Sequence, residues 1–180
     1  MEEAQNLITT EEGAMVLDRL EAEQWERKHL AREAEHYILC FDAELSTYLD
    51  KKKEYLRKTA DTNSGIRSGG PGRPTESMAI QSVKFDERYP ALRWLKTIEI
   101  LRRTLGERKN IFLRVRVEAA RPKKVTPLKG RPGWVGYVQR RYAEELEKRF
   151  LVGETYSDKA IRACWQGILE KAVDIYKKIS

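Results

Sequence analysis

The chain has 180 residues, of which 41% are hydrophobic and 35% are charged, and its formal net charge at neutral pH is +7. No apolar run approaches the roughly 20 residues that a membrane-spanning helix requires, and the acidic start MEEAQNLITTEEG is unlike a secretory signal. Composition therefore predicts a soluble, cytoplasmic protein with no membrane partner, thinner or more elongated than an average globular domain.

Charge is unevenly distributed along the sequence. Residues 1–60 hold 9 Lys and Arg against 14 Asp and Glu, a net charge of −5, whereas residues 61–180 hold 26 against 14, a net charge of +12. A localised positive field attracts polyanions, of which nucleic acid is the commonest. The alternative is a solvated basic surface that only maintains solubility.

The first 58 residues have the pattern of an acidic helical segment. They contain no proline, and apolar residues recur at helical spacing on both sides of a continuous apolar cluster at 37–41. This change of pattern predicts a break or hairpin near residues 34–42. The apolar face requires a partner, which is the C-terminal domain, another part of the same helix or, in a homo-oligomer, a second copy of the chain.

A flexible linker is predicted over residues 59–75, TADTNSGIRSGGPGRPT. Its four glycines, two prolines and small polar residues cannot bury enough apolar surface to order the segment. Pro74 cannot continue an earlier helix, so a new helix is expected to start beside Thr75. The GGPG stretch lacks the Lys-Ser/Thr ending of a phosphate-binding P-loop, and no nucleotide site is predicted there.

Residues 76–180 predict an α-helical DNA-binding domain, so the whole chain is expected to be all-α. Amphipathic segments cover residues 89–105 and 105–119, and two more cover 135–151 and 157–178. The last two are separated by a short turn that contains a glycine. Two amphipathic helices with such a turn have the outline of a helix-turn-helix.

The segment 157–178 is interpreted as the recognition helix. Ser157 is a favourable N-cap that leaves the helix N-terminus open to a phosphate. A buried stripe is predicted at helical spacing through Ile161, Trp165, Ile168, Ala172 and Ile175.

The residues left facing outward in its first two turns are Lys159, Arg162, Ala163 and Gln166. Arginine pairs bidentately with guanine and glutamine with adenine, whereas Lys159 suits a phosphate. The alternative is that these are ordinary solvated residues of a structural helix.

Residues 121–141 form a basic stretch, because they contain several Lys and Arg residues and no acidic residue. Three prolines exclude helix from the insertion at 118–133, and Val115 to Val117 are candidates for a short extended segment. A basic arm of this kind tracks the phosphate backbone. The predicted phosphate contacts are Lys123, Lys124, Lys129, Arg131, Arg140 and Arg141.

The string LGERKNIFLRVRVEA resembles the helix that opens the fourth region of primary sigma factors. The residues that carry this resemblance are Leu105, Glu107, Arg108, Phe112, Leu113 and Arg116. The upstream order, an acidic helix, a Gly-rich segment and a leucine-rich helix, resembles phage transcriptional activators of the RinA and ArpU type. The resemblance implies a sigma-like domain that binds double-stranded DNA at the bacterial nucleoid, contacts host RNA polymerase and activates phage late genes. The insertion departs from that pattern.

Two alternatives remain open: a phage DNA-packaging small subunit, and a helical adaptor that binds an acidic protein. No nucleophile pair or carboxylate dyad is recognised, so neither an enzyme nor a cofactor is predicted. Lone Cys40 and Cys164 lack metal-ligand spacing. His29 and His36, about 10 Å apart along one helix, cannot share a metal ion.

Overall fold

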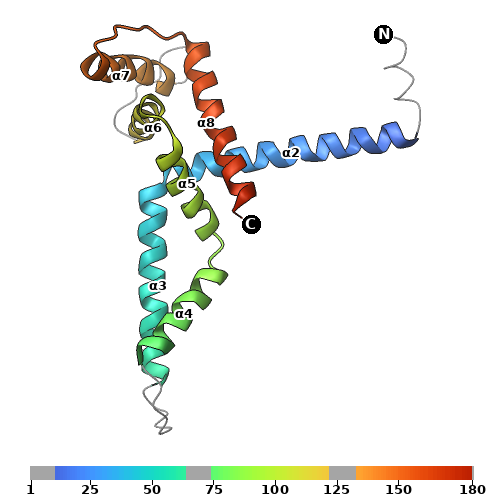
Figure 1. The fold of residues 1–180 in the computed structure, drawn as a ribbon, viewed down its shortest axis with the longest axis vertical. Coiled ribbons are helices and arrows are strands. Elements are labelled where there is room, and N and C mark those ends of the chain that lie inside the picture. Colours follow the sequence, from blue (N-terminus) through green and yellow to red (C-terminus); the bar gives the residue numbers. More distant parts are fainter. Residues whose placement is uncertain (1–10, 64–73, 122–132, 180) are drawn as a thin grey trace.

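The computed structural model describes residues 11–63, 74–121 and 133–179, and all regular elements in these ranges are α-helices (Figure 1). The predicted all-α class is therefore confirmed for the described chain. None of these helices is long and apolar enough to cross a membrane. The helices are α2 (Glu11–Leu39), α3 (Phe41–Asn63), α4 (Pro74–Arg88), α5 (Leu92–Thr104), α6 (Glu107–Ala119), α7 (Gly133–Phe150) and α8 (Asp158–Lys178).

The predicted break in the N-terminal segment is confirmed at Cys40, which separates α2 from α3. The chain turns sharply there, and α3 runs away from the line of α2 instead of folding back along it (Figure 1). Helical hydrogen bonding continues across the corner, because the Cys40 amide donates to the His36 carbonyl at 2.9 Å and the Glu44 amide to the Cys40 carbonyl at 2.9 Å.

Helices α3 and α4 pack together as an arm below the rest of the molecule (Figure 1). Aromatic rings join them, with the Phe85 centroid 5.9 Å from Tyr48 and 5.3 Å from Tyr55. Lys52 adds an ion pair to Asp86 at 2.7 Å. The helix restarts at Pro74, as the proline position indicated.

Helix occupies both ends of the expected linker, because α3 continues to Asn63 and α4 includes residues 74 and 75. Residues 64–73 lie outside the described ranges. The division into 1–58, 59–75 and 76–180 remains a prediction. The described helices on both sides of the linker nevertheless contribute to one hydrophobic core.

That core lies where α5, α6, α7 and α8 meet the second half of α2. Trp94 of α5 illustrates the arrangement: its ring stacks on Tyr176 of α8 at 4.1 Å and on Tyr37 of α2 at 5.7 Å. Its indole nitrogen donates to Glu33 at 3.2 Å. The C-terminal helices are therefore the partner that covers the second half of α2.

The expected short extended segment at Val115 to Val117 is wrong. These residues are helical because α6 continues to Ala119, where its buried side chains hold the helix against the core. Arg93 of α5 is half-buried. Its guanidinium lies 4.0 Å from the centre of the Tyr176 ring and donates to the Tyr176 carbonyl at 2.7 Å.

Candidate nucleic-acid interface

Helix α8 is held rigidly by its buried face. Ile161, Trp165, Ile168 and Ala172 are all buried, as the spacing predicted, while Ile175 is half-buried at the edge of the core. The Ser157 hydroxyl accepts a hydrogen bond from the Ala160 amide at 3.2 Å, which confirms the predicted N-cap.

Helix α7 fixes the turn that leads into α8. The Gln139 side-chain amide donates to the Tyr156 carbonyl at 2.8 Å and to the Asp158 carboxylate at 2.8 Å. Tyr142 packs beneath the same turn, with its ring centroid 5.2 Å from that of Tyr156 and 5.3 Å from that of Phe112. The start of α8 is thus oriented by polar and aromatic contacts from α6 and α7.

The outward-facing residues of α8 lie where the sequence placed them. Lys159, Arg162, Ala163 and Gln166 are exposed. Gln166 donates to Glu170 at 3.2 Å, one turn further along the helix. Within the described ranges no hydrogen bond or ion pair engages Lys159 or Arg162, so both side chains are available to a ligand.

The two arginines of α7 that were predicted to contact phosphate differ in whether other side chains already bind them. Arg140 is exposed and makes no hydrogen bond or ion pair with any described residue. Arg141 is bound to Glu144 at 2.7 Å and to Glu145 at 3.4 Å, and its hydrogen bond lowers the pKa of Glu144. A phosphate would therefore have to compete with these two carboxylates for Arg141.

The other four predicted phosphate contacts, Lys123, Lys124, Lys129 and Arg131, lie outside the described residues. The basic insertion therefore remains a prediction. The exclusion of helix from 118–133 is wrong at both ends of the insertion, because α6 includes residues 118 and 119 and α7 begins at Gly133.

Sequence reasoning missed the environment of Arg116. This side chain is only 5% exposed, with its guanidinium carbon 4.4 Å from the centre of the Trp134 ring and 5.0 Å from that of Trp165. It also donates to Glu35 of α2 at 3.0 Å. The only hint in the sequence was an arginine between valines in the IFLRVRV stretch, since an exposed arginine there would interrupt a buried face.

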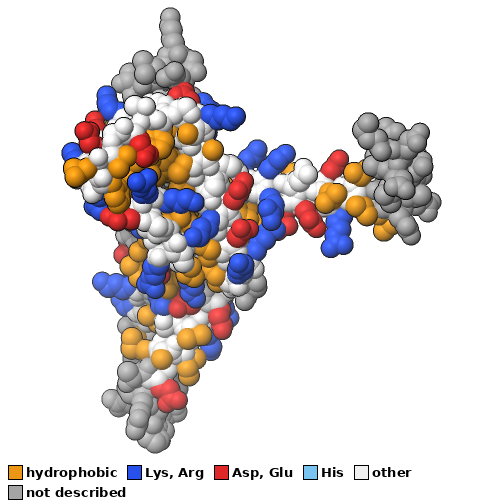
Figure 2. Space-filling model, turned by 45° about the horizontal axis from the view of Figure 1, so that its top comes forward, with side chains coloured by type: hydrophobic (Ala, Val, Ile, Leu, Met, Phe, Trp, Pro, Cys, Tyr) orange, Lys and Arg blue, Asp and Glu red, His pale blue; other side chains and the backbone are white. Residues whose placement is uncertain are grey.

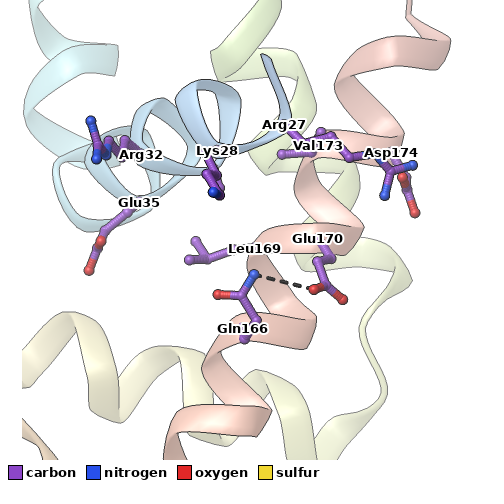
Figure 3. A pocket seen from close by; sticks show the side chains of 10 residues that line it. Arg27, Lys28, Arg32, Glu35, Gln166, Leu169, Glu170, Val173 and Asp174 are labelled. Carbon is purple, nitrogen blue, oxygen red and sulfur yellow. Dashed lines mark hydrogen bonds between the residues drawn. The ribbon is translucent and has the colours of Figure 1, made fainter. Parts of the chain in front are cut away.

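Sequence reasoning also missed a groove between α2 and α8. It has a volume of about 340 Å³. Figure 3 shows Lys28 and Glu35 of α2 facing Leu169 and Gln166 of α8 across it. The groove could not be anticipated, because helical periodicity identifies a buried face without identifying the helix that covers it.

The histidines and cysteines have ordinary surroundings. His29 lies 3.7 Å from Glu33 and His36 lies 3.1 Å from Glu44. Among the described residues no three His, Cys, Asp or Glu side chains are grouped to hold a metal ion. Burial raises the pKa of the Cys164 thiol, which disfavours the reactive thiolate.

No protein-family model, curated protein or solved structure matches the chain.

Proposed function

We propose that this protein is a sequence-specific double-stranded-DNA-binding regulator of transcription. The observation that carries the proposal is the outer face of α8. Lys159 and Arg162 are exposed there, and neither forms a hydrogen bond or ion pair with a described residue, while the opposite face of the helix is packed into the core. A rigid helix with a cationic and amide-bearing face has the chemistry for docking in the major groove.

Electrostatics supports a polyanionic ligand over a neutral one. Residues 61–180 carry a net charge of +12, and among them Arg140 of α7, close to the turn that leads into α8, forms no ion pair with a described residue. Phosphate contacts of this kind supply affinity and register, while base-edge contacts supply specificity. Arg162 and Gln166 are proposed as the base readers, and Lys159 and Arg140 as phosphate contacts.

The resemblance to phage activators extends the proposal to a biological role, activation of phage late genes with host RNA polymerase as partner. In that role no catalytic group and no cofactor is needed. The protein is proposed to act on the nucleoid of the bacterial host.

A selection of duplex fragments from the source genome, followed by fluorescence anisotropy at several salt concentrations, tests the proposal. We expect an enriched site upstream of late genes, bound at least 1,000-fold more tightly than random duplex, on the order of the usual specificity ratio. Enrichment of a packaging origin would instead identify a packaging subunit. Absence of salt-dependent duplex binding would reject DNA binding and favour an adaptor for an acidic protein.

A further inference from the structure

The segment that joins α7 to α8, residues 151–157, contains no regular structure and crosses the top of the molecule to reach the start of α8 (Figure 1). Within the part of the chain that the structure describes, no backbone–backbone hydrogen bond involves residues 152–156. Side chains must therefore hold this segment in place. Lys159 and Arg162 lie in the first two turns of the helix that follows, so their positions depend on the same side chains.

Gln139 of α7 contacts both the end of this segment and the first residue of α8. Its half-buried side-chain amide donates to the Tyr156 carbonyl at 2.8 Å and to the Asp158 carboxylate at 2.8 Å. An amide group has two N–H donors, and this arrangement uses both of them. One side chain thus ties the backbone before α8, and the beginning of α8 itself, to α7.

The other contacts of the segment hold its side chains and not its backbone. The Tyr156 ring packs against Tyr142 with centroids 5.2 Å apart, and its hydroxyl donates to Glu154. Arg108 of α6 lies 3.7 Å from Glu154, but the two side chains are 51% and 41% exposed, and ion pairs this accessible contribute little. Gln139 is therefore the contact that fixes the backbone next to α8.

Asp158 makes this contact important for an anionic ligand. Its carboxylate belongs to the first turn of α8, where the helix dipole attracts negative charge, so it competes with a DNA phosphate for that end of the helix. Gln139 holds the carboxylate against α7. Figure 2 shows Lys and Arg side chains interspersed with Asp and Glu on the helical body, so the placement of individual charges decides what this end of α8 binds.

We infer that Gln139 is a positioning residue for DNA recognition. It holds the first turn of α8 in the orientation that presents Lys159 and Arg162 to the duplex, and it keeps the Asp158 carboxylate against α7, away from the phosphates. This inference rests on the proposed DNA binding, and Gln139 acts through α8 without touching DNA. A preorganised helix loses less freedom on binding, and base reading depends on its orientation more than phosphate contacts do.

Fluorescence anisotropy of the full chain against the selected duplex and a random duplex tests the inference. Gln139→Met keeps the side-chain length and the helix propensity but removes both donors. We expect binding to the selected duplex to weaken about tenfold, the size of one or two lost hydrogen bonds, and binding to random duplex to weaken by less than about threefold. The amides of residues 152–160 should exchange with deuterium faster than in the wild type.

Asn110→Ala is the matched control. Asn110 also uses a side-chain amide to hold a turn, because it donates to the Leu105 carbonyl at 2.8 Å between α5 and α6. That turn carries no proposed DNA contact. The control should therefore lose a similar amount of stability in urea denaturation while keeping the wild-type ratio of selected to random affinity.

An exchange of donor and acceptor tests the contact directly. Gln139→Glu alone opposes two carboxylates and should lower the affinity ratio at least as far as Gln139→Met. Adding Asp158→Asn restores one of the two hydrogen bonds with its direction reversed, and should recover part of the ratio.

The outcomes separate this inference from the proposed function. A wild type that binds no duplex would reject DNA binding and the inference with it. A selective wild type would overturn the inference alone if Gln139→Met kept the wild-type affinity ratio, if Asn110→Ala lowered the ratio equally, or if the donor–acceptor exchange recovered nothing.

Discussion

Arg116 of α6 donates a hydrogen bond to Glu35 of α2 at 3.0 Å, and this contact joins the N-terminal helix to the candidate DNA-binding helices. The arginine is enclosed by Trp134 of α7 and Trp165 of α8, so four helices meet at one cation. Burial lowers the pKa of Arg116, and the charge of Glu35 opposes that effect. A buried cation of this kind depends on its acidic partner.

Arg116→Ala should therefore destabilise the protein strongly. Removal of one partner of a buried ion pair typically costs about 3–5 kcal/mol, and we expect about 2–3 kcal/mol here because water reaches Glu35, whose side chain is 39% exposed. Urea denaturation measures the loss. Arg116→Met should cost less because it keeps the contacts with both tryptophans.

Arg114→Ala provides the matched control. Arg114 also forms an ion pair, to Glu145 at 2.5 Å, but it lies at the surface with 56% of its side chain exposed. Its removal should cost less than about 1 kcal/mol. Equal losses at positions 114 and 116 would show that enclosure by the two tryptophans contributes nothing.

The sequence predicted most of the helices and the buried face of α8 because both depend on local patterns. The 4, 3, 4 spacing from Ile161 to Ala172 identifies the buried side of a helix, and it does so without any knowledge of which helix packs against that side. Contacts between distant segments, such as Arg116 with Glu35 or Leu169 beside Ala31, carry no such pattern. They depend on how the whole chain packs, which explains why the groove and the buried cation were missed.

The arm formed by α3 and α4 should loosen in acid through Asp86. Burial is the largest influence on its pKa and acts to raise it, but hydrogen bonds from Lys52 and Tyr48 outweigh burial and lower the pKa below its usual 3.8. The depressed value means that Asp86 contributes stability above its unfolded-state pKa of about 3.9. That contribution is lost as pH falls through the lower folded-state value.

Thermal unfolding at pH 7 and at about pH 2.5 measures this effect. The wild type should lose more stability between the two conditions than Asp86→Asn, in which the titrating group is absent. Glu87→Gln is the control, since Glu87 is an exposed neighbour on the same helix. If Asp86→Asn keeps the full acid sensitivity of the wild type, this carboxylate does not contribute as described.

Replacement of Leu151 by glycine should stabilise the protein. Leu151 directly follows α7 and has φ of 56°, in the left-handed region that disfavours side chains, and 90% of it is exposed, so little burial would be lost. Leu151→Gly should raise the free energy of unfolding by about 0.5–1 kcal/mol. Val152→Gly, at a half-buried position with ordinary backbone geometry, should lower it; a loss in both variants would contradict the strain argument.

The outer face of α8 gives the sharpest test of DNA recognition. Arg162 is exposed on a helix capped at Ser157 and packed into the core on its opposite side, so its removal should not disturb the fold. If it pairs with a base, Arg162→Ala should cost about 1–3 kcal/mol on the selected site and much less on random duplex. Fluorescence anisotropy against both duplexes gives the two affinities.

Two further variants are controls for that measurement. Arg140→Ala should weaken binding to both duplexes alike and reduce the salt slope by about 0.9, because a phosphate contact carries no sequence information. Ile168→Ala should instead destabilise the fold by about 2–5 kcal/mol, as expected for a buried aliphatic side chain. If Arg162→Ala reduces both affinities by the same factor, Arg162 contacts a phosphate, and base reading must lie at Gln166 or outside α8.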